Sequence, residues 1–311
     1  MSGYLVSQSW SADPHVLRFA ARRLLRIWPG LAAVVLLSTF VWGPLVSPLP
    51  LREYLQQPQI PDYLRNLMFV MRGALPVNFV GNALPFAVNG PLWTIPLELQ
   101  CYVALVVFGV LGLLRWRWVV LALTAAAALR YGVIEARGDF LARDMGLSLE
   151  QHFLLEFGLF FAAGVVLHHF FDGSARRRAA FVGGGWLFGL IAIQLGRPLL
   201  GLLLIVPCTV IGVATASTPV ARSAGRFGDL SYGLYIFAFP VQQTIVWLNH
   251  GRLPWVPLFL VTLLACVAMA LASWHLVEKR ALRLKPARPQ RAAVPTPGPH
   301  AEEERVSLSH Q

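Results

Sequence analysis

Eight long apolar runs, separated by connections of different length, constrain this chain more than any other feature of the sequence. A helix needs about 20 apolar residues to cross a hydrocarbon core of about 30 Å. Helices also satisfy every backbone polar group inside lipid. The runs therefore predict an all-α, polytopic membrane helix bundle with about eight complete transmembrane helices and a partial one near the N-terminus. They cover Gly30–Leu49, Trp93–Leu114, Trp118–Ile134, Phe153–Phe171, Phe181–Leu195, Leu199–Ala216, Tyr232–Leu248 and Trp255–His275.

The distribution of charge predicts the orientation. Charged residues make up only 13% of the 311 residues, and the net charge is +11. Most of the 26 Lys and Arg residues lie in connections on one side of the predicted membrane, including the basic segment Lys279–Arg291. By the positive-inside rule that side is cytoplasmic, and the C-terminus lies there too. The positive charge therefore sets the topology, and no nucleic-acid partner is predicted.

The longest connection, Pro50–Pro91, is rich in proline and is predicted to face outward. Within it, Tyr63–Met71 has helical apolar spacing but is too short to cross a bilayer. We interpret this segment as an interfacial or re-entrant helix.

Two regions differ in composition. Residues 1–285 form the predicted membrane domain, and residues 286–311 form a predicted disordered cytoplasmic tail with too few large apolar residues to fold. Cysteine spacing predicts neither a metal site nor a disulfide framework. The three cysteines, Cys101, Cys208 and Cys266, lie singly within apolar runs.

The stretch Asn89–Tyr102 carries a carboxylate from a loop into an apolar run. Pro96 suits the first turn of a helix, where its missing N–H costs nothing. Glu98 and Tyr102 are four residues apart and share one helix face. Because a charge exposed to hydrocarbon costs about 2.5 kcal/mol or more, Glu98 is predicted to point into the bundle with Tyr102 and to border a cavity open to the outer side. The alternative is a wetted carboxylate at headgroup level.

Four stretches together resemble the acyltransferase type 3 family of bacterial membrane O-acyltransferases, and the resemblance covers about residues 1–285. Each motif alone is weak, but their order and spacing between the apolar runs make the resemblance specific. They are Phe19–Pro29, with the pattern Arg-Arg-x-x-Arg-Ile-x-Pro; Asn89–Tyr102, with Leu-Trp-Thr-x-x-x-Glu-x-x-x-Tyr; Asp229–Ile236, with Ser-Tyr-x-x-Tyr; and Leu276–Lys279, with the glutamate that closes the last helix.

The resemblance implies a ten-span fold in the bacterial cytoplasmic (inner) membrane. It implies a reaction in which an acyl group, usually acetyl from acetyl-CoA, passes to a hydroxyl of a saccharide or lipid-linked acceptor of the cell envelope. Acyl-CoA is then a donor substrate, and no permanently bound cofactor is implied. The family's first span carries a catalytic histidine that no segment here matches, and Ser2–Val6 resembles the end of the second span. We therefore expect an N-terminally incomplete member, with an inactive shortened relative as the alternative.

The resemblance also assigns roles to residues. It places the acceptor chemistry on Glu98, Trp93, Tyr102 and Asn89. It places the donor phosphates on a basic cytoplasmic opening, and the fork geometry of arginine suits phosphate. For these arginines, topology-setting charge that meets anionic lipid is the alternative. The predicted donor-binding residues are Arg22, Arg23 and Arg26.

A carrier or flippase for a saccharide or lipid is the alternative function, because sparse charges within a polytopic bundle fit both classes. Transporters often have paired halves with broken helices, and no such pairing is visible in this sequence, so the motifs favour the enzyme. Arg130 lies inside a predicted span near its outer end. It either snorkels outward or faces an acceptor cavity.

Overall fold

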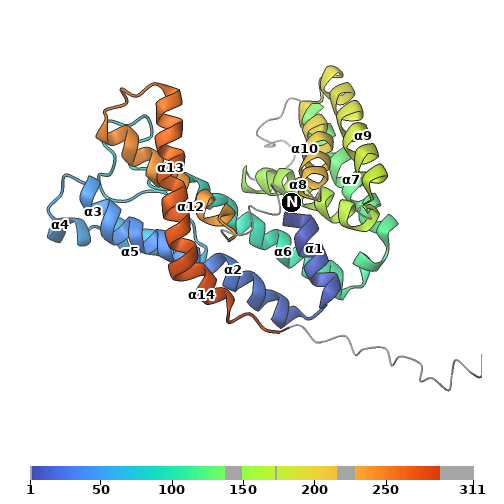
Figure 1. The fold of residues 1–311 in the computed structure, drawn as a ribbon, viewed down its shortest axis with the longest axis horizontal. Coiled ribbons are helices and arrows are strands. Elements are labelled where there is room, and N and C mark those ends of the chain that lie inside the picture. Colours follow the sequence, from blue (N-terminus) through green and yellow to red (C-terminus); the bar gives the residue numbers. More distant parts are fainter. Residues whose placement is uncertain (1, 137–148, 172–173, 216–227, 288–311) are drawn as a thin grey trace, which may run out of the picture.

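The computed structural model describes residues 2–136, 149–171, 174–215 and 228–287 (Figure 1). Within these residues the fold is all-helical, and the β-structure there consists of one isolated bridge between Ala74 and Ala87. This confirms the predicted all-α class. From residue 288 on, the predicted tail lies outside the described residues.

Each predicted apolar run falls on a helix. Length and apolar composition together qualify four helical segments as candidate membrane spans: Val16–Val46, Gly90–Val110, Phe153–Phe170 and Trp255–Leu282. The predicted total of about eight spans is therefore not confirmed. The long helices are α1 (Ser2–Ala12), α2 (Val16–Leu37), α6 (Thr94–Val110), α7 (Arg117–Ala136), α8 (Leu149–Phe170), α9 (Ala175–Gln194), α10 (Pro198–Ala214), α12 (Ser231–Leu248) and α13 (Trp255–Ser273).

Short helical pieces extend or connect these. A π-helical turn at Ser38–Trp42 joins α2 to α3 (Gly43–Val46), and another at Trp274–Glu278 joins α13 to α14 (Lys279–Leu282). A 3₁₀ turn at Gly90–Trp93 leads into α6. Pro96 lies in the first turn of α6, as the sequence predicts.

The N-terminal residues form the expected short helix. Helix α1 packs along α8 at a crossing between two glycines. A Cβ on Gly3 would lie 1.9 Å from the carbonyl oxygen of Phe161, and a Cβ on Gly164 would lie 2.8 Å from the backbone nitrogen of Tyr4. Small residues let helix backbones approach this closely within a membrane. The crossing therefore fixes α1 beside α6 and α8.

Helix α6 connects two groups of helices. In Figure 1, α2, α12, α13 and α14 lie together on one side of it, and α1 and α7–α10 lie on the other. Helix α2 contacts α12 and α14, whereas α6 contacts α1 and α8. The C-terminal half of α2 has an apolar core, with Leu31, Val34 and Val35 completely buried. Nearer its start, Phe19 of α2 packs edge-on against Tyr102 of α6, with ring centroids 6.4 Å apart.

The predicted helix at Tyr63–Met71 is wrong in its extent. Helix α5 (Gln59–Leu64) continues as a 3₁₀ turn only to Met68. It ends there because Phe69 takes a left-handed conformation with φ of 61°. The fully buried Asn66 then holds the chain in a loop, donating from Nδ2 to the carbonyl oxygens of Tyr63 and Arg72 and accepting from the Arg72 N–H. A side-chain amide that bonds to the backbone competes with helix in this way.

Candidate functional site

Glu98 faces the bundle in a hydrogen-bonded group. The Tyr102 hydroxyl donates to Oε1 of Glu98 at 2.5 Å, and the Ser2 hydroxyl of α1 donates to the same oxygen at 2.8 Å. Tyr102 is 7% exposed, and Glu98 is half-buried. Oε2 of Glu98 accepts no hydrogen bond from the described residues and is therefore available to a further donor.

Arg23 reaches the same group from α2. Its guanidinium lies over the ring of Tyr102, 6.0 Å from the centroid, and over the ring of Phe19 at 5.7 Å. Its Nη2 also approaches the Ser9 hydroxyl at 3.5 Å. A guanidinium over an aromatic face is attracted by the ring quadrupole. Arg23, which is predicted to bind the donor, thus contacts Tyr102, and Tyr102 is the hydrogen-bond partner of Glu98.

Arg22 forms a buried ion pair that the sequence did not reveal. Its Nη1 lies 2.8 Å from Oδ2 of Asp13, and Arg18 holds the same carboxylate through Nε and Nη2 at 2.9 and 2.6 Å. The hydrogen bonds from Arg18, and then those from Arg22, hold the pKa of Asp13 well below its usual range. Asp13 therefore remains ionised and keeps Arg22 in place at the junction of α1 and α2.

Several arginine donors at this point have no partner. Nε and Nη2 of Arg22, together with Nε of Arg23, are buried without a hydrogen bond to any described residue. Buried polar groups are almost always paired, and an unpaired donor costs about 1–3 kcal/mol. These donors are free to bind an anion such as a phosphate oxygen.

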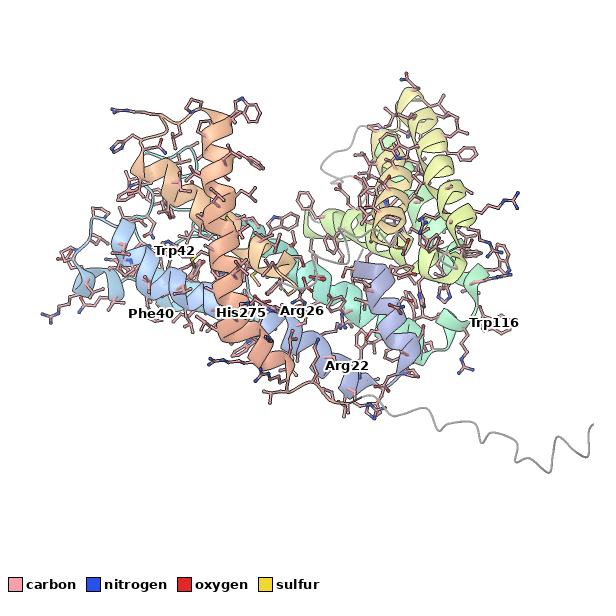
Figure 2. All side chains as sticks on the ribbon, viewed as in Figure 1. Arg22, Arg26, Phe40, Trp42, Trp116 and His275 are labelled. Carbon is pink, nitrogen blue, oxygen red and sulfur yellow. The ribbon has the colours of Figure 1, made fainter. Side chains whose placement is uncertain are left out.

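Arg26 joins two further motifs. Its Nη2 lies 2.6 Å from Oδ2 of Asp229, and its Nη1 lies 3.4 Å from Oε2 of the buried Glu278. Its guanidinium also covers the ring of Tyr232 at 5.6 Å. Partial burial raises the pKa of Asp229, but the hydrogen bond from Ser231 and the charge of Arg26 outweigh it and lower that pKa. Figure 2 shows Arg22 and Arg26 along α2, with His275 of the C-terminal helix nearby.

Lys285, which follows α14, adds to this basic cluster. Burial, and then the charges of Arg23 and Arg26, lower the pKa of its ammonium group. Like charges disfavour one another's charged forms. An anion bound among these side chains would relieve that repulsion. At Lys285 the positive charges of the neighbouring arginines therefore outweigh the negative charge of Asp229.

Asn89 and Trp93 lie apart from this group. Asn89 is 1% exposed and donates from Nδ2 to the carbonyl oxygen of Ile236 at 2.8 Å, which ties the start of α6 to α12. Trp93 is half exposed and packs against Phe153, with ring centroids 5.1 Å apart. In the same region Tyr235 bonds to the carbonyl oxygen of Pro91. Asn89 therefore makes a structural contact, and Trp93 remains half exposed beside Phe153.

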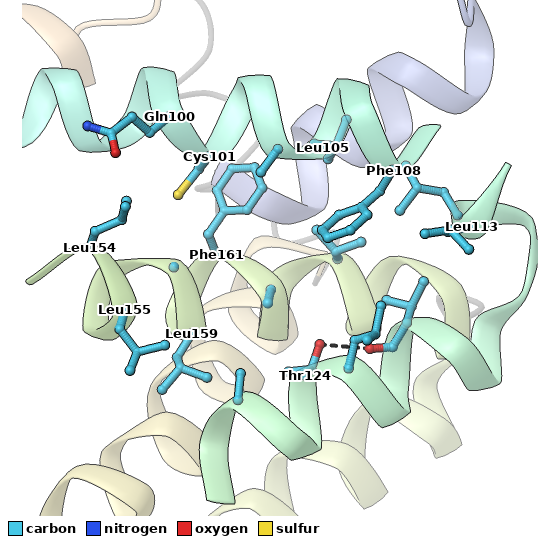
Figure 3. A pocket seen from close by; sticks show the side chains of 18 of the residues that line it. Gln100, Cys101, Leu105, Phe108, Leu113, Thr124, Leu154, Leu155, Leu159 and Phe161 are labelled. Carbon is cyan, nitrogen blue, oxygen red and sulfur yellow. Dashed lines mark hydrogen bonds between the residues drawn. The ribbon is translucent and has the colours of Figure 1, made fainter. Parts of the chain in front are cut away.

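A large cavity lies along the other flank of α6, between α6, α7 and α8 (Figure 3). Its volume is about 600 Å³, and its lining extends from Gln100, Leu154 and Arg130 to Leu113 and Val120. Glu98 is not among the lining residues, because its carboxylate is hydrogen-bonded toward α1. The expectation that Glu98 itself borders a cavity is therefore not met by this cavity.

Ser2, Asp13 and Lys285 were missed by sequence reasoning. The scarcity of acid was the available signal for Asp13, because the chain has only 15 Asp and Glu residues and this one lies just before a run of arginines. Ser2 gave no signal, since its role depends on the packing of α1 against α6. Within the described residues no group of His, Cys, Asp and Glu is arranged to hold a metal ion.

Apolar helices with a carboxylate and arginines between them define a membrane protein with ionisable groups inside its bundle. Such residues within membrane helices mark functional sites. The family of the acyltransferase domain (Acyl_transf_3) matches residues 1–277. The chain belongs to this family of acyltransferases.

Two characterised relatives are similar over most of their lengths. An O-acetyl transferase of Shigella phage Sf6 is 26% identical over 285 residues, which are 91% of this chain and 82% of that protein. Nodulation protein 10 of Rhizobium leguminosarum bv. viciae is 25% identical over 320 residues, covering 92% of this chain and 80% of that protein. No solved structure matches this chain. The family and the first relative support an O-acyltransferase.

Proposed function

We propose that this protein transfers an acetyl group from acetyl-CoA to a hydroxyl of a saccharide or related cell-envelope acceptor. The contact that carries the proposal is the one between Arg23 and Tyr102, the hydrogen-bond partner of Glu98. It brings the predicted donor-binding arginines beside the predicted acceptor-side carboxylate. In this proposal the charge distribution places the C-terminus in the cytoplasm, and the family resemblance implies the bacterial cytoplasmic membrane.

The predicted topology is consistent with this meeting of sites. Arg23 lies on the cytoplasmic side of the predicted span that begins at Gly30, and Tyr102 lies about 12 Å along α6 from Thr94 at 1.5 Å per residue. In the proposed topology α2 enters from the cytoplasm and α6 enters from the outer side. A donor bound from inside and an acceptor bound from outside would then meet between the two helices.

The chemistry assigns Glu98 as general base. Its free Oε2 accepts the proton of the acceptor hydroxyl while the hydroxyl oxygen attacks the acyl carbonyl carbon. A C–O bond forms, the C–S bond breaks, and the CoA thiolate leaves and takes up the proton. The Ser2 and Tyr102 hydroxyls hold the other carboxylate oxygen in place. A positioned base of this kind contributes typically about 10²–10⁴-fold to the rate.

The arginines bind the donor in this scheme. Coenzyme A carries several phosphate groups, and the free donors on Arg22 and Arg23 are suited to phosphate oxygens. Arg26 already has Asp229 and Glu278 as partners, so it adds charge to the opening rather than free donors.

Glu98→Gln tests the acceptor side. It keeps the shape and removes the basic oxygen, so we expect a loss of transfer of about 100-fold or more. The assay follows labelled acetyl from acetyl-CoA to an envelope saccharide by purified protein in lipid. Glu53→Gln, on the exposed face of α4 (Leu51–Leu55), is the matched control. Normal transfer by Glu98→Gln would remove the assigned role.

Replacement of Arg22 and Arg26 by Ala tests the donor side. The lost charge-assisted contact of Arg22 is expected to cost about 1.5–3 kcal/mol, or roughly 10–150-fold in affinity for CoA, and the lost charge of Arg26 weakens binding further. Because both arginines also pair with carboxylates, Lys variants that keep the charge are measured in parallel, and the exposed Arg252→Ala is the control. Unchanged CoA affinity in the folded Ala variants would show that Arg22 and Arg26 do not bind the donor and only set the membrane topology.

A further inference from the structure

We infer that the cavity between α6, α7 and α8 holds the hydrocarbon chain of a lipid-linked acceptor, with the anionic phosphate of that lipid at Arg130. This inference rests on the proposed function and names its substrate class: an acceptor that is anchored in the membrane.

The wall of the cavity is suited to hydrocarbon. Of the side chains that line it, only Gln100, Thr124 and Arg130 are polar. Thr124 donates to the carbonyl oxygen of Val120 on its own helix at 2.8 Å, so it presents no free hydrogen (Figure 3). The rest of the lining is apolar, and an apolar cavity of this kind does not hold ordered water well. A hydrocarbon chain is the occupant that this wall matches.

The length of the cavity matches one leaflet of a bilayer. Along α7 the lining runs from Val120 to Arg130, and along α8 it runs from Leu154 to Val165. At 1.5 Å per residue these distances are about 15 and 16 Å. The hydrocarbon core of a bilayer is about 30 Å thick. Along these two helices the cavity therefore has the length of a single lipid chain.

Two of the three polar lining residues, Gln100 and Arg130, lie toward the same end of the cavity. Gln100 lies near the start of α6 and Arg130 lies near the end of α7, and Leu154 at the start of α8 lies beside Gln100 in the view of Figure 3. Arg130 is exposed and makes no hydrogen bond or ion pair with the described residues. Snorkelling alone would place an arginine at a helix end. A free guanidinium at the mouth of an apolar cavity also has the geometry to bind a phosphate headgroup.

This end of the cavity lies next to Glu98. Gln100 and Cys101 follow Glu98 within one turn of α6, which is a rise of about 5 Å. Phe161 lines the cavity, and its ring centroid lies 6.1 Å from that of Tyr102. A headgroup at this end of the cavity would therefore lie level with Glu98 along α6, where the packed rings of Phe161 and Tyr102 link the cavity wall to the Glu98 carboxylate. A freely diffusing saccharide would need no such apolar channel.

Photolabelling tests the occupant directly. The probes are a long-chain alkyl phosphate with a diazirine at the chain end and the matching uncharged alcohol, each added to the full protein in phosphatidylcholine nanodiscs. Gly158→Leu fills the cavity, because no heavy atom lies within 4 Å of the position that a Cβ would take there. Gly183→Leu in α9 makes the same change at an equally open position outside the cavity.

We expect the phosphate probe to label peptides of α7 and α8. Gly158→Leu should reduce this labelling about tenfold, and Gly183→Leu should leave it unchanged. Arg130→Gln should weaken the apparent affinity of the phosphate probe about tenfold, which corresponds to about 1.4 kcal/mol, without affecting the alcohol. Equal labelling of Gly158→Leu and wild type would overturn the inference. If the two probes labelled equally and Arg130→Gln had no effect, the cavity would bind any bilayer lipid. This result would also overturn the inference.

Transfer assays separate this inference from the proposed function. With an acceptor linked to a long-chain lipid phosphate, Gly158→Leu should lose most of its activity, while transfer to the same saccharide without a lipid should be unchanged. If a folded Gly158→Leu variant lost transfer to both acceptors, the cavity would not act only by binding the lipid chain of the acceptor, and the inference would be contradicted. If wild type transferred acetyl to neither acceptor, the proposed function would fail, and the photolabelling would still decide what occupies the cavity.

Discussion

The close contact between α1 and α8 makes a quantitative prediction for Gly3→Ala. The added Cβ would lie 1.9 Å from the carbonyl oxygen of Phe161, whereas the shortest ordinary C···O contacts are about 3.3 Å. Helix α1 must therefore move away by roughly 1.4 Å. The Ser2 hydroxyl would move with it, and its 2.8 Å bond to Glu98 would break.

The cost follows from these two effects. Overpacking at a tight contact costs about 1–3 kcal/mol, and loss of a hydrogen bond to a half-buried carboxylate adds about 1.5 kcal/mol. We expect Gly3→Ala to lower the free energy of unfolding by about 2.5–4.5 kcal/mol. Gly164→Ala should cost less, about 1–2 kcal/mol, because its Cβ would lie 2.8 Å from the Tyr4 nitrogen.

Equilibrium unfolding in mixed micelles measures these values, and acetyl transfer reports on the position of Ser2. Gly183→Ala in α9 is the control, since its Cβ would meet no heavy atom within 4 Å. That variant should be neutral or more stable by about 0.5–1 kcal/mol. The double variant Gly3→Ala/Gly164→Ala should cost less than the sum of the two, because both substitutions separate the same helices. Wild-type stability in Gly3→Ala, or strict additivity, would refute the packing argument.

Two further predictions concern the regions on either side of this contact. Asp13 has a folded-state pKa far below its unfolded value of about 3.9, so its stabilising effect is complete above about pH 4 and is lost as pH falls toward the folded-state pKa. Unfolding at pH 7 and pH 3 should therefore show a larger loss in wild type than in Asp13→Asn, and equal losses would contradict the pairing with Arg18 and Arg22. Asn66→Ala should destabilise the protein by about 1–3 kcal/mol, because it leaves the buried carbonyl of Tyr63 without this hydrogen bond and removes two part-buried bonds to the backbone of Arg72. Unfolding in mixed micelles measures this effect, and a cost below about 1 kcal/mol would show that water replaces the lost bonds.

Local sequence patterns predicted the helices and part of the site. Apolar runs of membrane length specify helices because no other local structure satisfies the backbone in lipid. The four-residue spacing of Glu98 and Tyr102 predicted that they share a face, and their 2.5 Å hydrogen bond confirms it. Both features depend on residues close together in the chain.

Tertiary structure alone decided which charges pair. Arg26 contacts Glu278 across 252 residues of sequence and Asp229 across 203, and a basic residue in a helix carries no local mark of its partner. The same holds for Ser2, whose bond to Glu98 exists only because two glycines bring α1 against α8. The end of the helix at Met68 was also unpredictable, since the left-handed Phe69 is held by a buried asparagine rather than by a glycine. Periodicity determines which segments are helices, whereas the contacts between helices determine which side chains form a site.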